Sequence, residues 1–320
     1  MAARHAPFVT PTILNKSGPR YIKDGDTHPL VASSTSFTGK PSQAVIMTPN
    51  EGQHENMGWR LKECEIYGQR VWQPKHHRMR VEPVWGMRAY MMSDLRIEKT
   101  HFRSAFKEHD FYVDCDFEHG DVVLDGNYFQ DAMSQAIQIV GPWSRPYNSG
   151  WPQRAENAGE LYITANLIVN CGRWNYWAAQ GISRPSFALS VFKAVRRLKC
   201  FVHGNHLKSV GKKQPDGSYS YGAMMFERTR YLEVMNNLVE YKQPSNRDVL
   251  LFDGVDELVA EGNQIMGGHV HFDLPNEVIW QGNQGWGSVK WTDASGKTKF
   301  LGDVTGTYVF QQGQPVTVKP

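Results

Sequence analysis

The sequence has little of several features that mark common functional classes. Its four cysteines, Cys64, Cys115, Cys171 and Cys200, have neither zinc-ligand spacing nor the density of a small disulfide-bonded domain, so we interpret them as free thiols that mostly pack. No run of about 18 apolar residues could cross a bilayer, and the first residues lack an apolar secretory signal. The 35 basic and 32 acidic residues nearly balance, so no general affinity for nucleic acid or an anionic membrane is expected.

What the sequence does contain is a repeat of the form apolar, x, apolar, x, x, Asn, x, apolar. Its copies are VVLDGNYF (122–129), LYITANLI (161–168), CFVHGNHL (200–207), LEVMNNLV (232–239), LVAEGNQI (258–265) and a weakened VIWQGNQG (278–285), and two copies at 59–66 and 95–102 replace the Asn. Of the 24 aligned apolar positions only Gly285 is not apolar, although just 40% of the chain is hydrophobic. Coincidence does not explain this pattern.

The spacing within the repeat predicts strands. Apolar residues alternate before the Asn and resume two positions after it, as on a strand that turns a corner and continues. Glycine often precedes the Asn and tolerates the left-handed backbone of such a corner. We interpret the asparagines as structural, stacked along the axis of a solenoid. A leucine-rich repeat has a tighter period and lacks the long aromatic insertions found here.

These Asn-cornered coils, over residues 44–286, resemble the right-handed parallel β-helix of the pectate-lyase-like superfamily. That superfamily includes polysaccharide lyases, glycoside hydrolases and bacteriophage tailspikes. The resemblance implies an all-β solenoid of about eight coils. It says less about chemistry, because one fold carries many functions.

Both ends of the chain depart from the repeat. Residues 1–43 are rich in Pro, Gly, Ser and Thr without periodicity and are predicted to form an N-terminal arm or attachment segment. Residues 287–320 contain short β segments separated by turn residues. Because the end of a solenoid exposes apolar core and unpaired strand groups, we expect this segment to form a small β cap or to join neighbouring chains.

Long insertions between coils carry many aromatic and basic residues. Tryptophan faces and guanidinium groups suit sugar rings with acidic substituents, and equally suit a protein interface. The candidate glycan-binding or interface residues are Trp72, Trp143, Tyr147, Trp151, Arg173, Trp174, Tyr176, Trp177, Tyr219 and Tyr221. We expect no metal site, since the adjacent His76 and His77 have no nearby carboxylate, and no cofactor.

Three carboxylates form the candidate catalytic site. Counting back eleven residues from each of the last three repeat asparagines reaches a phenylalanine, predicted inward, followed by a carboxylate, predicted outward. The phenylalanines are Phe226, Phe252 and Phe272, and the carboxylates are Glu227, Asp253 and Asp273. A two-residue slip would continue the pattern at Phe192 and Lys193. Carboxylates about 4.8 Å apart on consecutive coils should raise the pKa of at least one, as a general acid requires.

Other interpretations remain open at this stage. Asp253 and Asp273 both precede residues typical of turns, so they could simply open turns. Glu98 and Asp125, with His101 and Tyr128 three residues further along, form a second outward pair. A lyase would instead need a basic proton acceptor, for which Lys193, Arg197 and Arg230 are candidates.

The arm, the solenoid and the β-rich end together are similar to a short bacteriophage tailspike. The resemblance implies a homotrimeric virion protein, made in the host cytoplasm without a signal peptide, that binds and possibly cleaves a host surface polysaccharide. Its arm would contact other virion tail proteins, and neither nucleic acid nor membrane would be a partner. The alternatives are a free polysaccharide hydrolase or lyase, secreted by a non-classical route, and a non-catalytic structural virion protein.

Overall fold

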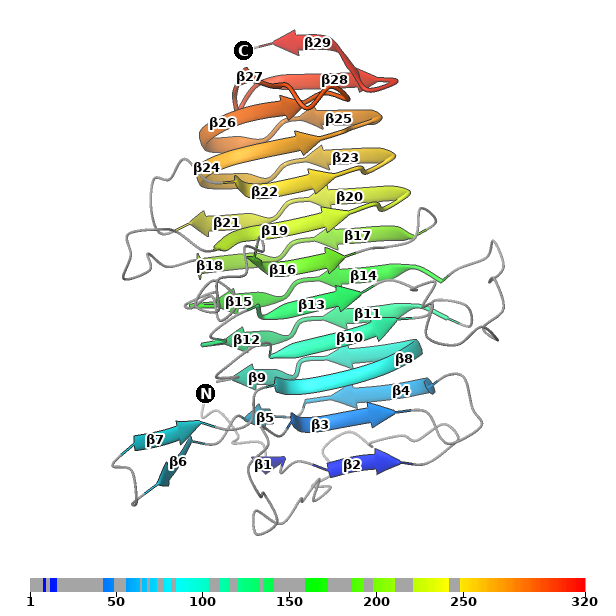
Figure 1. Ribbon diagram of the computed structural model, residues 1–320, viewed down its shortest axis with the longest axis vertical. Coiled ribbons are helices and arrows are strands. Elements are labelled where there is room, and N and C mark those ends of the chain that lie inside the picture. The colour runs from blue at the N-terminus through cyan, green and yellow to red at the C-terminus, as the bar shows by residue number, and fades with distance from the viewer. Residues whose placement is uncertain are drawn as a thin grey trace.

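The computed structural model describes residues 8–9, 12–15, 43–48, 56–63, 65–67, 70–73, 78–81, 85–103, 110–115, 120–132, 135–140, 159–171, 186–192, 198–210, 221–241 and 248–319. This part of the chain contains strands and turns and no helix. Twenty-seven strands join in one hydrogen-bonded sheet. Most are stacked in parallel along one axis, with β2 near the N-terminal end and β29 at the other (Figure 1). This arrangement is compatible with the parallel β-helix predicted from the repeat.

The strands form three columns, in each of which a strand pairs in parallel with the equivalent strand of the next coil. The first column precedes the repeat Asn and comprises β4 (Asn56–Lys62), the end of β8 (Trp85–Glu98), β11 (Val122–Asp125), β14 (Leu161–Thr164), β17 (Lys199–His203), β20 (Tyr231–Met235), β23 (Glu257–Glu261) and β25 (Glu277–Gln281). The second follows the Asn and comprises β1 (Phe8–Val9), β5 (Glu65–Tyr67), β9 (His101–Arg103), β12 (Tyr128–Gln130), β15 (Leu167–Val169), β18 (His206–Val210), β21 (Leu238–Tyr241), and the starts of β24 (Gln264–Asp273) and β26 (Gln284–Thr292).

The third column completes each turn. It comprises β2 (Thr12–Asn15), β3 (Gln43–Thr48), the start of β8, β10 (Phe111–Cys115), β13 (Ile137–Val140), β16 (Ser186–Phe192), β19 (Tyr221–Glu227), β22 (Asp248–Asp253) and the ends of β24 and β26. Separately, β6 (Arg70–Gln73) and β7 (Arg78–Val81) form an antiparallel pair.

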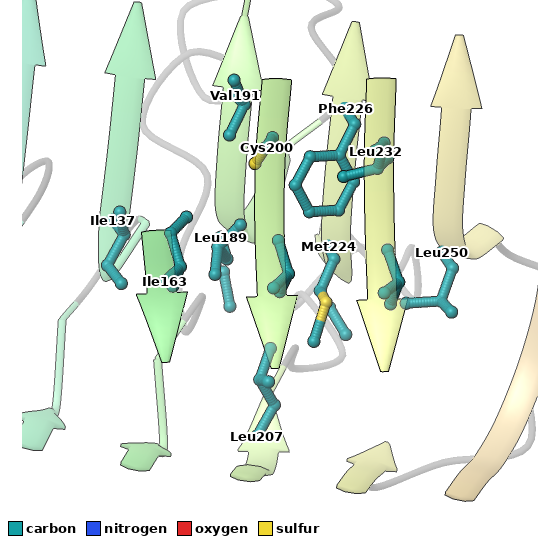
Figure 2. Packing of buried hydrophobic residues seen from close by; sticks show 14 of the residues in the cluster. Ile137, Ile163, Leu189, Val191, Cys200, Leu207, Met224, Phe226, Leu232 and Leu250 are labelled. Atoms are coloured by element: carbon teal, nitrogen blue, oxygen red, sulfur yellow. The ribbon is translucent and has the colours of Figure 1, made fainter. Parts of the chain in front are cut away.

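The apolar repeat positions face the interior wherever their side chains are described, apart from Gly285, which is exposed. Leu95, Leu124, Ile163 and Val202, for example, are all fully buried. Figure 2 shows side chains of the first and third columns directed toward one another across the interior. The register predicted from the sequence is therefore confirmed.

The repeat asparagines form a continuous buried ladder from Asn127 to Asn283. The Nδ2 group of each donates to Oδ1 of the next, at 2.8 to 3.0 Å, and also to a backbone carbonyl of the preceding coil. The backbone N–H of each asparagine donates to the same Oδ1 as its side chain. The asparagines are thus structural, as expected.

The residue before the Asn position of each of the eight repeats has a left-handed backbone, with φ between 48° and 68°, including the two repeats that replace the Asn. Glycine occupies four of these corners, as the sequence indicated, but four others hold side-chain-bearing residues, namely Glu63, Lys99, Ala165 and Asn236. The corner therefore tolerates a Cβ, because the ladder and the flanking strand bonds hold the backbone there.

The C-terminal strands run against the stack. β27 (Thr298–Asp303) pairs antiparallel with β26, β28 (Thr307–Gln311) with β25, and β29 (Gln314–Lys319) with β28. Trp280, Tyr308 and Phe310 are buried among them, and Trp280 Nε1 donates to the Val304 carbonyl at 2.9 Å. No helix of membrane-spanning length and hydropathy occurs in the described ranges.

Candidate functional site

The three predicted carboxylates lie side by side on the outer face of the third column. Glu227 is in register with Asp253, and Asp253 with Asp273, at the ends of β19, β22 and β24. We call this set the carboxylate column. Adjacent strands of a sheet are about 4.8 Å apart, so each carboxyl group has a neighbour on the next coil.

The phenylalanines that precede these carboxylates stack inside the molecule. The ring centroids of Phe226 and Phe252 are 6.0 Å apart and those of Phe252 and Phe272 are 5.8 Å apart. One coil earlier, however, Val191 pairs with Phe226, so the predicted slip that placed Phe192 in this stack is wrong. The coil between β16 and β17 has a different length, so a constant offset does not apply there.

The electrostatics of the column distinguish its middle member. Partial burial, followed by the negative charges of Asp273 and then Glu227, raises the pKa of Asp253 above its ordinary value, and these causes outweigh the lowering effect of Arg228 and His271. Arg228 Nε lies 3.7 Å from Glu227 Oε1, so the guanidinium group partly offsets the negative charge of Glu227. The column therefore makes ionisation of Asp253 less favourable than that of an ordinary aspartate.

The turn interpretation receives little support from the hydrogen bonds. The chain turns after each carboxylate through a left-handed residue, namely Arg228, Gly254 and Leu274. The amides of these residues donate to backbone carbonyls of the next coil. Within the described residues, no hydrogen bond links the Asp253 or Asp273 carboxylate to the turn that follows it. Their side chains are therefore not needed to hold the turns.

A polar network lies beside the carboxylate column and was not predicted as a site. His271, two residues before Asp273, bonds through Nδ1 to Asp248 Oδ2 at 2.9 Å and through Nε2 to Thr292 Oγ1 at 2.8 Å. Lys290 Nζ lies 2.7 Å from Asp248 Oδ1. His271 shares the outer face of β24 with Asp273 because the two are two residues apart. Asp248 precedes a shift in strand register, so a constant offset in the sequence does not lead to it.

The two carboxylates of the second predicted pair are in register, but each already has a partner of its own. Glu98 pairs with Asp125 between β8 and β11, and His101 stacks on Tyr128 with centroids 4.4 Å apart. Arg96 Nη1 lies 3.2 Å from Glu98 Oε1, and Thr164 Oγ1 donates to Asp125 Oδ1 at 2.6 Å. Each carboxylate therefore has its own partner, which makes this pair the weaker candidate.

Aromatic side chains on the outer face of the first column stack on one another. The rings of Tyr162 and Phe201 are 5.0 Å apart and nearly parallel, so each covers a face of the other. The Tyr162 hydroxyl donates to Glu160, and this bond, helped by partial burial, raises the pKa of Tyr162 to about 12. Since each ring covers one face of the other, the pair stabilises the stack.

Most of the predicted glycan-binding or interface residues cannot be placed. Trp143, Tyr147, Trp151, Arg173, Trp174, Tyr176, Trp177 and Tyr219 lie outside the described residues, as do His76, His77, Lys193 and Arg197. Trp72 lies in β6 and Tyr221 in β19, where only the backbone is described. Arg230 is exposed in the part that the structure describes.

The described cysteine side chains are free and buried, namely Cys171 and Cys200. Burial raises the pKa of both thiols, which suits packing and not nucleophilic chemistry. Across the described ranges, no group of three or more His, Cys, Asp or Glu side chains is placed to hold a metal ion.

Comparisons with known protein families, with curated proteins and with solved structures found no match to this chain. The functional argument therefore depends on the geometry of the site.

Proposed function

We propose that this chain is a pectate-lyase-like, right-handed β-helix of about eight coils with a C-terminal β cap. It serves as a tailspike-like virion protein that binds and hydrolyses a host surface polysaccharide. Residues 1–43 attach it to other tail proteins, and the native assembly is a homotrimer. The observation that carries the catalytic part is the raised pKa of Asp253 between two in-register carboxylates.

Each carboxylate has a distinct role in the proposed reaction. Asp253, whose raised pKa favours the protonated form, is the general acid that protonates the leaving glycosidic oxygen. Asp273, the neighbour with the larger charge effect on Asp253, is the nucleophile that forms a glycosyl-enzyme intermediate. Glu227 keeps the pKa of Asp253 high. A separation of about 5 Å between the acid and the nucleophile corresponds to hydrolysis with retention of configuration.

The test compares cleavage with binding on purified capsular and lipopolysaccharide O-antigen polysaccharides. Asp253→Asn and Asp273→Asn should each lower the release of new reducing ends by about 1,000-fold or more, because each removes a group that takes part in bond cleavage. Binding should persist, since neither carboxylate is needed to hold the sugar. The exposed Asp303→Asn is the matched control and should cleave normally.

Other outcomes separate the rival functions. Undiminished cleavage by both column variants would remove the column as the catalytic site. Binding without cleavage by the unaltered protein would favour a non-catalytic virion protein. Products carrying an unsaturated sugar, detected by their ultraviolet absorbance, would indicate a lyase, because elimination leaves a double bond whereas hydrolysis does not.

A further inference from the structure

A hydroxyl, an imidazole and a carboxylate form a continuous hydrogen-bonded chain next to the carboxylate column. Asp248 Oδ2 lies 2.9 Å from His271 Nδ1, and His271 Nε2 lies 2.8 Å from Thr292 Oγ1. The three residues come from β22, β24 and β26, which are successive strands of the third column. Thr292 is in register with Asp273, so the two features share one face.

The protons in this chain can be assigned. Burial raises the pKa of Asp248, but hydrogen bonds from His271 and Lys290 outweigh it, and the pKa is lowered overall. An ionised carboxylate only accepts, so His271 Nδ1 donates to Asp248. When the ring carries its proton on Nδ1 alone, Nε2 accepts and the Thr292 hydroxyl donates to it. Thr298 Oγ1, 2.7 Å from Thr292 Oγ1, supplies the remaining donor.

We infer that Thr292, His271 and Asp248 form a nucleophilic site for the hydrolysis of acyl esters. A hydroxyl bonded to an imidazole that a carboxylate orients is the arrangement by which such groups are activated on unrelated folds. This activity goes beyond glycosidic cleavage and does not depend on it. Lys290 holds Asp248 from the other side at 2.7 Å, which fixes the carboxylate that orients the imidazole.

The reaction proceeds in two balanced steps. Thr292 Oγ1 bonds to the ester carbonyl carbon while its proton passes to His271 Nε2. The carbon–oxygen bond to the alcohol breaks, and the departing alkoxide takes that proton. Water, deprotonated by the same nitrogen, then attacks the acyl-threonine, which releases the carboxylic acid and returns the proton to Thr292. The net change is ester plus water to acid plus alcohol, and no oxidant or reductant is needed.

The site is open to a small ester. The bond between Thr292 and Thr298 lies at the exposed surface, and the side chain of His271 retains 12% exposure.

A neighbouring pair provides a matched control. His269 Nδ1 lies 2.6 Å from Ser288 Oγ, on the same two strands and the same face. Within the described residues, no carboxylate hydrogen bonds to His269, so the third member is lacking. Ser288 thus reproduces the hydroxyl–imidazole contact without the group that orients the ring.

The experiment measures turnover of p-nitrophenyl acetate by the full-length protein. Thr292→Val keeps the shape and β-branching of the side chain and should lower kcat/KM by about 100-fold, as should Asp248→Asn. Thr292→Ser, which keeps a hydroxyl, should retain turnover, and Ser288→Ala should match the unaltered protein. Circular dichroism and thermal unfolding check that each variant folds.

A second measurement needs no variant. Phenylmethylsulfonyl fluoride should modify the unaltered protein once, with the added mass located on Thr292 by peptide mapping. Turnover by folded Thr292→Val equal to that of the unaltered protein would overturn the inference. So would an absence of both turnover and labelling, or a label on Ser288 or another residue.

Discussion

At the scale of single residues, the site depends on how one carboxyl group responds to its surroundings. Asp253 is partly buried and lies between Asp273 and Glu227, and all three conditions disfavour its ionised form. A structural carboxylate usually acquires a cation or amide donors that lower its pKa. Asp253 shows the opposite shift, which is common at catalytic positions.

The same shift predicts a change in stability. Because the pKa of Asp253 is raised on folding, the folded state binds this proton more tightly than the unfolded chain does. Stability is therefore lost as the pH rises from the unfolded pKa through the folded one. Asp253→Asn should raise the free energy of unfolding at pH 7 and leave it unchanged at pH values below the ordinary Asp pKa, measured by chemical denaturation.

Asp293 supplies a control of opposite sign. Hydrogen bonds from Ser295 and Lys297 lower the pKa of this exposed turn carboxylate, so its contribution is present above the unfolded pKa and lost as the pH falls. Asp293→Asn should slightly reduce stability at pH 7, because this carboxylate is fully exposed. A loss of stability at pH 7 in Asp253→Asn would contradict the assigned pKa shift.

At the scale of elements, the asparagine ladder connects the coils. Asn205→Ala should cost about 3 kcal/mol, because the buried N–H groups of Asn166 lose an acceptor and the Ile163 carbonyl loses a donor. Chemical denaturation gives the free energy of unfolding. Asn276 is exposed, and Asn276→Ala should change stability by less than about 0.5 kcal/mol. Equal effects of the two variants would show that the ladder contributes little.

The elements also show what the sequence could predict. The stacked phenylalanines and the carboxylates beside them were predictable, because the last three coils have a constant offset between their third-column strand and the Asn. Asp248 was not, because the register shifts between it and Leu250. Lys290 and Thr292 lie in β26, after the last clear copy of the repeat. The repeat therefore does not predict that this strand continues the third column.

The wrong placement of Phe192 has a related cause, since it also depended on counting residues from a repeat Asn. A two-residue slip places Phe192 beside Phe226, but strand pairing selects a register by the whole pattern of buried residues and not by one side chain, and Val191 holds that position. Insertions of varying length between the coils likewise prevent a constant residue offset from placing a side chain. The aromatic residues in them carry no periodicity, so their sequence indicates composition and not position.

At the scale of the whole molecule, the proposed homotrimer has a direct test. Light scattering after size-exclusion chromatography should give three times the chain mass of 36.4 kDa. Exposed apolar side chains near the C-terminal end, such as Trp286 and Phe300, are the described residues that a neighbouring chain could cover. A concentration-independent monomer would contradict the trimer and weaken the tailspike proposal.

Removal of residues 287–320 would not test the trimer cleanly, because it changes the fold as well as the oligomeric state. Phe272 packs against Phe310, with ring centroids 5.5 Å apart, and the buried Trp280 donates to the Val304 carbonyl, so truncation would expose the core as well as alter assembly. The double substitution Trp286→Ser and Phe300→Ser changes only exposed side chains. It should shift the assembly toward monomer while the thermal unfolding of the single chain stays close to that of the unaltered protein.

The central claim is that Asp253 acts as an acid whose pKa the carboxylate column sets, and the pH dependence of kcat/KM for polysaccharide cleavage tests it most directly. The unaltered protein should show a bell-shaped profile, whose descending limb reports deprotonation of Asp253. Glu227→Gln removes one of the negative charges that raise this pKa, so the descending limb should move to lower pH while turnover persists. A descending limb that stays in place in Glu227→Gln, or moves to higher pH, would contradict the account.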